Sequence, residues 1–304
     1  MPKSLLGPKY WLLWLGIGIM RLEVMLPIKW QLAIGRGVGM LFYWLVPKRR
    51  HIAHVNINLC FPEKSLSERK ALVKDSFKSL GMGAIEAFIA WFMPERRFKK
   101  IPFHWIGEAS TMAFIKNAQH AMTISGHFTC LEIAGRFFGQ CFSGYGMPLN
   151  LVHKQSHHPL FEYLMTKGRS PYSESLIKHT NVKGMVRCLR ERKVLWYAPD
   201  QDFGLSRSVW TTFFGIPTAT VPGVSVLARV GHAEVIPVFF RRLPTGGYEG
   251  LSFEPLTNFP SGDDVADAQR WQSLLEEYIR KYPDQYLWIH RRFKTRPEGS
   301  ASVY

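Results

Sequence analysis

"AMTISGHFTCLE", residues 121–132, joins a short apolar stretch to a histidine and, five positions later, to a glutamate. Residues 121–125 predict a β-strand, and residues 130–140 predict the helix that follows it. A strand, a short turn and a helix in this order are the repeating unit of α/β proteins, in which sites collect beyond the carboxyl ends of the strands. His127 falls at that end of the predicted strand.

The same alternation continues to the end of the chain. Further strands are predicted at residues 149–153, 194–198, 234–240 and 248–254, and further helices at 159–167, 183–192, 221–230 and 265–281. Residues 65–93 also have a helical pattern. Strands that alternate with helices predict an α/β fold with a mixed, largely parallel sheet flanked by helices.

The composition narrows the class of partner. The chain has 304 residues, of which 46% are hydrophobic, so it is long enough for one large domain with a helical annex. Its formal net charge of +16 favours anionic partners, and its ten tryptophans favour a membrane surface over nucleic acid. The four cysteines are scattered without a C-x-x-C pair, which predicts reduced thiols and no zinc site.

The N-terminal region is strongly apolar. The runs at residues 10–20 and 37–47 contain several tryptophans, and a basic cluster follows at residues 48–50. This pattern predicts an N-terminal helical membrane-anchoring segment over residues 1–47, ahead of a catalytic α/β domain over residues 48–304.

A single tilted span from Tyr10 to Ile28 is the predicted anchor. Arg21 and Glu23 interrupt it, so a span requires that the two charges pair or face protein. Otherwise the segment lies in the membrane interface. A buried core helix is the alternative outside a membrane, because length alone does not separate it from an anchor.

The spacing of His127 and Glu132 allows two interpretations. On one helix they would lie about 140° apart, so they meet only if His127 sits in the turn and Glu132 in the first helical turn. A carboxylate that accepts from one imidazole nitrogen raises the basicity of the other, as in catalytic triads. Alternatively, Thr129 and Glu132 form a capping box and do no more than begin the helix.

The stretch "DQD" at residues 200–202 also has two interpretations. Asp200 and Asp202 resemble the metal-binding D-x-D of nucleotide-sugar glycosyltransferases. A polar turn between Pro199 and Gly204 accounts for the same residues without chemistry.

Several longer blocks give the chain a family resemblance. They are H-x4-E at residues 127–132, "NLCFPE" at 58–63, "VLWYAPDQDFG" at 194–204, "SRSVWTTFFGIPTATV" at 206–221 and "DQYLWIHRRFKTRPEG" at 284–299. In this order they resemble the bacterial lipid A late acyltransferases, the lauroyl/myristoyl transferases of the glycerolipid acyltransferase superfamily. The resemblance covers nearly the whole chain.

The resemblance implies transfer of a fatty acyl chain from acyl carrier protein to a hydroxyl on an acyl chain of a Kdo-lipid A precursor. His127 would be the general base and Glu132 its partner. No cofactor and no metal are expected, because the acyl group is carried on the phosphopantetheine of the carrier protein. The implied place is the bacterial inner membrane, with the catalytic domain on the cytoplasmic side and inner membrane lipids as further partners.

Four more residues are candidate substrate-binding residues by this resemblance. Arg169 matches a Gly-Arg of the family and is expected to bind the acceptor, since guanidinium groups bind phosphate in a bidentate way. Asp200 and Asp202 lie in the block that lines the acceptor site. Lys154 stands where the family often has an arginine, and an ammonium group cannot donate two parallel hydrogen bonds to one phosphate as a guanidinium group does.

Two other functions compete with the acyltransferase. A membrane-associated glycosyltransferase would use Asp200 and Asp202 with a metal ion. A non-enzymatic protein would bind anionic lipid through its basic, tryptophan-rich surface and would not need His127.

Overall fold

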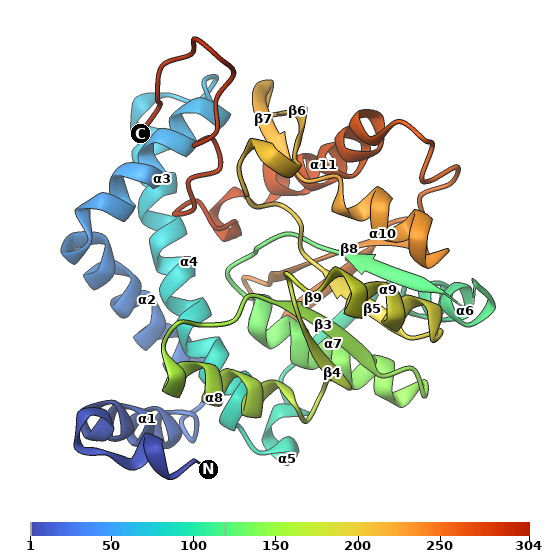
Figure 1. Cartoon of the computed structure of the whole chain (residues 1–304). Helices are drawn as coiled ribbons and strands as arrows, with labels where there is room; N and C mark the ends of the chain where they lie inside the picture. The colour runs from blue at the N-terminus through green and yellow to red at the C-terminus, as the bar shows by residue number, and fades with distance from the viewer. Residues whose placement is uncertain (1, 119) are drawn as a thin grey trace.

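The computed structural model describes residues 2–118 and 120–304, and its centre is a seven-stranded sheet (Figure 1). The strand order is β1-β9-β8-β2-β5-β3-β4, and every neighbouring pair is parallel except β8 and β9. The strands are β1 (Phe103–Ile106), β2 (Ala121–Ile124), β3 (Leu149–His153), β4 (Ser175–Lys178), β5 (Val194–Tyr197), β8 (Glu234–Arg242) and β9 (Tyr248–Ser252). The predicted mixed, largely parallel α/β sheet is confirmed.

Helices cover both faces of this sheet. From residue 66 onward the helices are α4 (Leu66–Phe92), α5 (Glu95–Phe98), α6 (Glu108–Ala118), α7 (Leu131–Gly144), α8 (Pro159–Arg169), α9 (Val182–Arg190), α10 (Gly223–Gly231) and α11 (Asp264–Lys281). Helix α4 packs on α7, whereas α9 packs on α10. Because the crossovers through α7 and α9 run in opposite directions along the sheet, these two helices lie on opposite faces.

The five predicted strands are all present, but four others were missed. A hairpin of β6 (Val209–Phe213) and β7 (Ile216–Thr220) forms a second, two-stranded sheet. Strands β1 and β4 have four residues each and lie at the two edges of the main sheet, where part of their surface is exposed. Short edge strands carry little apolar alternation, and the sequence pattern therefore did not reveal them.

The N-terminal region consists of short helices instead of one long one. After the 3-10 turns η1 (Lys3–Leu6) and η2 (Pro8–Tyr10), α1 (Trp11–Glu23), α2 (Ile28–Leu45) and α3 (Pro47–Cys60) follow. Helix α2 packs closely along α4, where a Cβ added at Gly39 would lie 2.0 Å from the carbonyl oxygen of Phe77. Only a glycine permits this approach of the two backbones.

The predicted span from Tyr10 to Ile28 is not supported by the structure. Helix α1 has 13 residues and ends at Glu23, before Pro27 begins the next helix, so it is about 20 Å long against a hydrocarbon core of about 30 Å. Across residues 2–118 and 120–304, no helix combines the length and apolar character needed to cross a membrane. The division into segments 1–47 and 48–304 stays a prediction.

The two charges of this segment also do not pair with each other. Arg21 lies over the ring of Phe92, and Glu23 is buried, which raises the pKa of its carboxyl group to about 7. Pairing of the two charges is thereby excluded, but both lie against protein, so it is the length of α1 that leaves the span unsupported.

A buried ion pair fastens α4 to the sheet. Glu86 on α4 is fully buried and accepts hydrogen bonds from Arg242 of β8, including one of 2.9 Å from Nη2, and from the hydroxyl of Tyr248 at 2.7 Å. Arg242 also donates to the hydroxyls of Ser79 at 2.8 Å and Thr129 at 3.0 Å. This network connects α4 with the loop that follows His127.

Replacing Arg242 with methionine is expected to lower the free energy of unfolding by about 3–5 kcal/mol, because it leaves the charge of Glu86 buried without a partner. Arg280→Met is the control, since the Arg280–Glu276 pair is partly exposed and should contribute no more than about 1 kcal/mol. Urea unfolding of both variants measures the difference, and equal losses would contradict a structural role for the buried pair.

Candidate active site

Neighbouring strands bring His127 and Asp200 together. Strands β2 and β5 pair in parallel with Ile124 opposite Tyr197, and the two site residues each follow three positions later. Both therefore emerge at the carboxyl edge of the sheet, where sites of α/β proteins lie. Gly126 leaves room for the side chain of Leu275, because a Cβ there would lie 2.5 Å from one of its methyl carbons.

Asp200 holds the imidazole in one orientation. Its Oδ1 lies 2.5 Å from Nδ1 of His127, and its Oδ2 accepts from the backbone N–H of His127 at 2.9 Å and the hydroxyl of Tyr286 at 2.8 Å. An ionised carboxylate is only an acceptor, so Nδ1 carries the proton and Nε2 presents a lone pair. The side chain of His127 is 27% exposed, whereas that of Asp200 is 2% exposed.

The pKa values of the pair follow from this contact. Burial by itself lowers the pKa of His127, but the charge and hydrogen bond of Asp200 outweigh it and raise that pKa above the ordinary value. Burial by itself raises the pKa of Asp200, and the adjacent imidazole, the backbone N–H and Tyr286 hold it well below its usual range. The carboxylate is therefore ionised at neutral pH and increases the basicity of Nε2.

Glu132 does not make the contact with His127 that the sequence predicted. Its carboxylate accepts from both Nε and Nη2 of Arg169, the former at 3.1 Å, and from Nε1 of Trp91 at 3.0 Å. Two donors from α4 and α8 thus turn it away from the imidazole. Asp200 occupies the partner position, although its role could not be settled from the sequence alone.

The capping-box interpretation is wrong as well. Helix α7 begins after Cys130, without a side-chain cap. The hydroxyl of Thr129 lies 2.7 Å from that of Ser79 and accepts from Arg242, and its backbone N–H donates to the carbonyl of Gln285. Thr129 therefore holds the loop against α4 and β8 instead of capping α7, and Glu132 faces the cavity.

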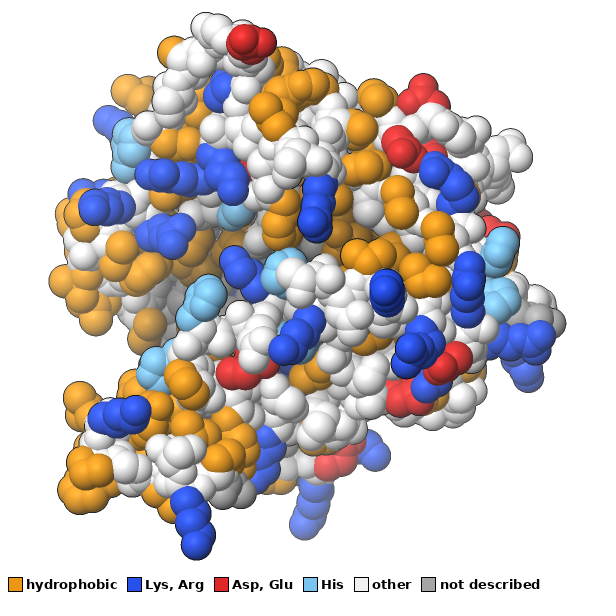
Figure 2. Space-filling view, in the orientation of Figure 1, with side chains coloured by type: hydrophobic (Ala, Val, Ile, Leu, Met, Phe, Trp, Pro, Cys, Tyr) orange, Lys and Arg blue, Asp and Glu red, His pale blue; other side chains and the backbone are white. Residues whose placement is uncertain are grey.

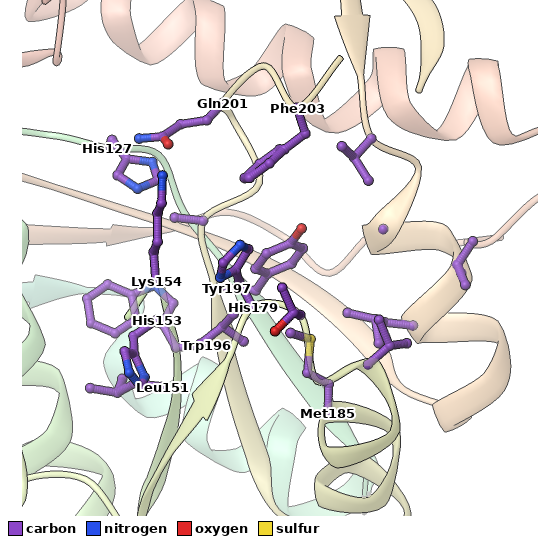
Figure 3. Close-up of a pocket in the computed structure, with 18 of the residues that line it drawn as sticks. His127, Leu151, His153, Lys154, His179, Met185, Trp196, Tyr197, Gln201 and Phe203 are labelled. Atoms are coloured by element: carbon purple, nitrogen blue, oxygen red, sulfur yellow. The ribbon is translucent and has the colours of Figure 1, made fainter. Parts of the chain in front are cut away.

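A cavity of about 960 Å³ extends from His127 along the carboxyl edge of the sheet. One part of its wall is polar and charged, with His127, Glu132, Arg169, His153 and Lys154. Another part is largely apolar and is formed by Met185, Trp196, Val226, Leu227 and Phe203. Figure 3 shows Lys154 extending toward His127, with Trp196 and Met185 lower in the view. The volume lies at the upper end of ordinary ligand sites, which hold about 300–1,000 Å³.

The remaining predicted residues divide into two groups. Arg169 and Lys154 line the cavity with His127 and Glu132. Asp202 is buried behind it, where it accepts from the backbone N–H and hydroxyl of Thr295 and the backbone N–H of Gly204. Asp202 thus holds the C-terminal segment in place. Its contact with Thr295 could not be expected from the sequence, because the two residues lie far apart along the chain.

The D-x-D interpretation fails on the same contacts. The carboxylates of Asp200 and Asp202 accept protein hydrogen bonds from different partners and are not turned toward one common point. Within the described parts of the chain, no group of three histidine, cysteine or acidic side chains is arranged to hold a metal ion.

Cys130 is excluded as a nucleophile. Its thiol is buried and burial raises its pKa to about 12, so the thiolate is scarce at neutral pH. Its side chain packs inward, and all four cysteines are free. The arrangement around His127 therefore suits abstraction of a proton from a bound hydroxyl, without a covalent intermediate on the protein.

Comparison with known proteins agrees with this chemistry. A sequence profile described as bacterial lipid A biosynthesis acyltransferase matches residues 1–295. The chain is 38% identical to a lipid A biosynthesis lauroyltransferase of Escherichia coli K12, over 99% of this chain and 97% of that protein. It is 34% identical to a palmitoleoyltransferase and 27% identical to a myristoyltransferase of lipid A biosynthesis from the same organism, each over 99% of this chain. The two alignments cover 97% and 93% of those proteins.

The chain therefore belongs to the bacterial lipid A biosynthesis acyltransferase family and is an acyltransferase. Membership of this family argues against both alternatives, the glycosyltransferase and the non-enzymatic lipid-binding protein.

Sequence reasoning missed the contributions of Tyr286 and Trp91. Tyr286 donates to Asp200, and Trp91 donates to Glu132. Both lie far from the motif in the sequence. For Asp200 a signal was available, because "APD" directly follows an apolar strand and places an acid at a strand end.

Proposed function

We propose that this enzyme moves a fatty acyl chain from acyl carrier protein to a hydroxyl on an acyl chain of a Kdo-lipid A precursor. The observation that carries the proposal is the His127–Asp200 pair beside a cavity of about 960 Å³ with a largely apolar part. Such a cavity accepts hydrocarbon on its apolar wall and places a hydroxyl or thioester near the base. The relatives named as lauroyl, palmitoleoyl and myristoyl transferases support an acyl donor of this general length.

His127 acts as general base in the proposed reaction. Its Nε2 takes the proton of the acceptor hydroxyl as that oxygen attacks the thioester carbonyl carbon. The tetrahedral intermediate expels the thiolate, and the imidazolium returns the proton to sulfur. Asp200 stabilises the imidazolium without itself becoming protonated. No resident cofactor takes part, since the acyl group arrives on the phosphopantetheine arm of the carrier protein.

Arg169 is proposed to bind a phosphate of the acceptor. Glu132 occupies Nε and Nη2 of its guanidinium group, which leaves further N–H donors for a ligand in the cavity. Glu132 then has the role of orienting Arg169. Lys154, on the same wall, supplies a second positive charge.

Replacing Arg169 with lysine is expected to raise the KM for the acceptor by about tenfold or more, because a lysine keeps a charge beside Glu132 but loses the fork. The KM for the donor should change little. Lys167→Ala is the matched control, since Lys167 is an exposed cation of α8 outside the cavity. An equal rise with an acceptor that lacks phosphate would contradict this role.

The proposed reaction is tested with purified enzyme, a tetra-acylated Kdo-lipid A precursor and carrier proteins loaded with lauroyl, myristoyl or palmitoleoyl groups. Mass spectrometry of the products is expected to show the acceptor plus one acyl group, with one donor used in preference. An unchanged acceptor with every donor, under conditions in which a related transferase acylates it, would refute the proposal.

We further propose that the enzyme rests on the cytoplasmic side of the bacterial inner membrane through α1 and α2. These helices expose a row of large apolar side chains: Trp11, Leu12, Leu15, Ile19, Leu22, Trp30, Leu41 and Trp44. Figure 2 shows hydrophobic and basic side chains together on the side of the molecule that α1 and α2 occupy in Figure 1. An apolar face with tryptophans and nearby cations suits insertion into the membrane interface.

Replacing Trp11, Leu15 and Trp30 with serine is expected to abolish flotation with vesicles of bacterial inner membrane lipids, because the apolar anchors are lost. Circular dichroism should be unchanged, since all three side chains are mainly exposed. The control is the same number of serine substitutions at Val265, Leu66 and Val182, which are exposed apolar residues of other helices. Flotation that survives the first set would contradict this orientation.

A further inference from the structure

Helix α9 presents a basic stripe that the proposed reaction does not use. Lys183, Arg187 and Arg190 are all exposed and, at 100° per residue, lie within about 60° of each other around the helix. Val182 and Val186 border the stripe, and Val230 of α10 lies beside it. Val182 and Val230 are 47% and 40% exposed, so the stripe has an apolar margin open to solvent.

In the described parts of the chain, none of these three cations has an acidic partner, and Arg190 donates only to the backbone carbonyl of Val230. Within residues 2–118 and 120–304, no carboxylate lies within 4.0 Å of the side-chain nitrogens of Lys183 or Arg187. Nearby Lys193 differs, because it pairs with Glu174 at 2.8 Å and Glu191 at 3.5 Å. The stripe is therefore a source of uncompensated positive potential on the surface.

The stripe adjoins the active-site cavity. It lines a surface depression of about 450 Å³ together with Glu191, whose carboxylate pairs with Lys193. Val182 belongs both to this depression and to the wall of the cavity that contains His127. The exposed Lys154 and Arg207 line the cavity itself, and the cations of α9 lie next to it without lining it. A molecule bound on α9 thus has direct access to the cavity rim.

The stripe also lies away from the apolar N-terminal helices. In Figure 1, α1 and α2 are at the left edge and α9 is at the right, and Figure 2 shows basic side chains over the region of α9. If α1 and α2 rest on the membrane, α9 faces the aqueous side. A soluble partner reaches this face, whereas a lipid headgroup remains near α1 and α2.

We infer that α9 is the docking surface for the acidic carrier protein that delivers the acyl thioester, an inference that rests on the proposed function. Lys183, Arg187 and Arg190 would face acidic side chains along one helix of the carrier. Val182, Val186 and Val230 would receive an apolar side chain at its centre, the usual arrangement of a charged rim around an apolar contact. The phosphopantetheine arm then enters the cavity past Val182 and carries the thioester to His127.

The test compares two donors that differ only in the carrier. Wild type and the double variant Lys183→Glu/Arg187→Glu are supplied with lauroyl-acyl carrier protein or with lauroyl-pantetheine. The matched control is Lys70→Glu/Lys74→Glu, which reverses two exposed cations with the same spacing on α4. Reversal on α9 is expected to raise the KM for the carrier-linked donor by about tenfold or more, because like charges now face the carrier.

The expected result has two further parts. The α9 variant keeps wild-type kinetics with lauroyl-pantetheine, and the α4 control keeps them with both donors. A KM for lauroyl-acyl carrier protein that is the same in wild type and the α9 variant would overturn the docking surface, and so would an equal loss with both donors. Absence of transfer by the wild type from either donor would instead refute the proposed function.

Discussion

Replacing His127 with alanine is expected to lower kcat for acyl transfer by about 10²–10⁴-fold, since a positioned general base contributes a factor of this size. The lone pair of Nε2 is the group lost. Asp200 keeps its hydrogen bonds from the backbone N–H of residue 127 and from Tyr286, so the carboxylate does not become an unpaired buried charge. Steady-state kinetics with the carrier-linked donor measure the change.

The control for this variant is His157→Ala. His157 is exposed and lies outside the cavity, so its loss should leave kcat unchanged. Circular dichroism and thermal unfolding establish that both variants are folded. Near-wild-type turnover by folded His127→Ala would remove the residue from the mechanism.

Replacing Asp200 with asparagine is expected to lower kcat by a comparable factor, about 10²–10⁴-fold. An amide does not stabilise the imidazolium, and it offers an N–H to Nδ1 that favours the wrong tautomer. The side chains are of equal size, so the loss reports charge and hydrogen bonding more than packing.

Tyr286→Phe separates the catalytic contact of Asp200 from its structural one. The variant removes only the hydroxyl that donates to Oδ2 at 2.8 Å and leaves the contact with His127. Its kcat should fall by less than about tenfold, because the net value of one hydrogen bond to a charged group is about 1.5–3 kcal/mol and only part of it acts in the transition state. If Tyr286→Phe lowered kcat as much as Asp200→Asn does, the main role of Asp200 would be to support the loop rather than to stabilise the imidazolium of His127.

The fold was largely predictable because its central strands are apolar runs separated by amphipathic helices. The five predicted strands and the helices after them were found within a few residues of their predicted bounds. The edge strands β1 and β4 were not, because half-exposed strands of four residues have no distinctive period. One continuous helix was predicted from Tyr10 to Ile28 because the segment is apolar along most of its length. In the structure a turn before Pro27 divides it into two helices, and hydropathy does not reveal that turn.

The site was predictable only in part. His127 was found from its position after a strand and from the family resemblance, and Arg169 and Lys154 from the resemblance alone. The family motif H-x4-E led to Glu132 as the partner of His127, whereas in the structure Asp200 makes that contact and Glu132 binds Arg169. In an α/β sheet, a residue at the end of one strand lies close to the residue at the end of the neighbouring strand. The order of the strands, which makes β2 and β5 neighbours, cannot be read from their sequences.

We propose that Asp200, rather than Glu132, sets the basicity of His127. The pH dependence of kcat/KM tests it most directly, measured for wild type, Asp200→Asn and Glu132→Gln. The wild-type rate should rise with pH as His127 loses its proton, with a midpoint above that of an ordinary histidine, because Asp200 raises this pKa. In Asp200→Asn the midpoint should move to lower pH, since the charge that stabilises the imidazolium is gone, whereas in Glu132→Gln it should stay in place. A midpoint that moves in Glu132→Gln and not in Asp200→Asn would contradict the account.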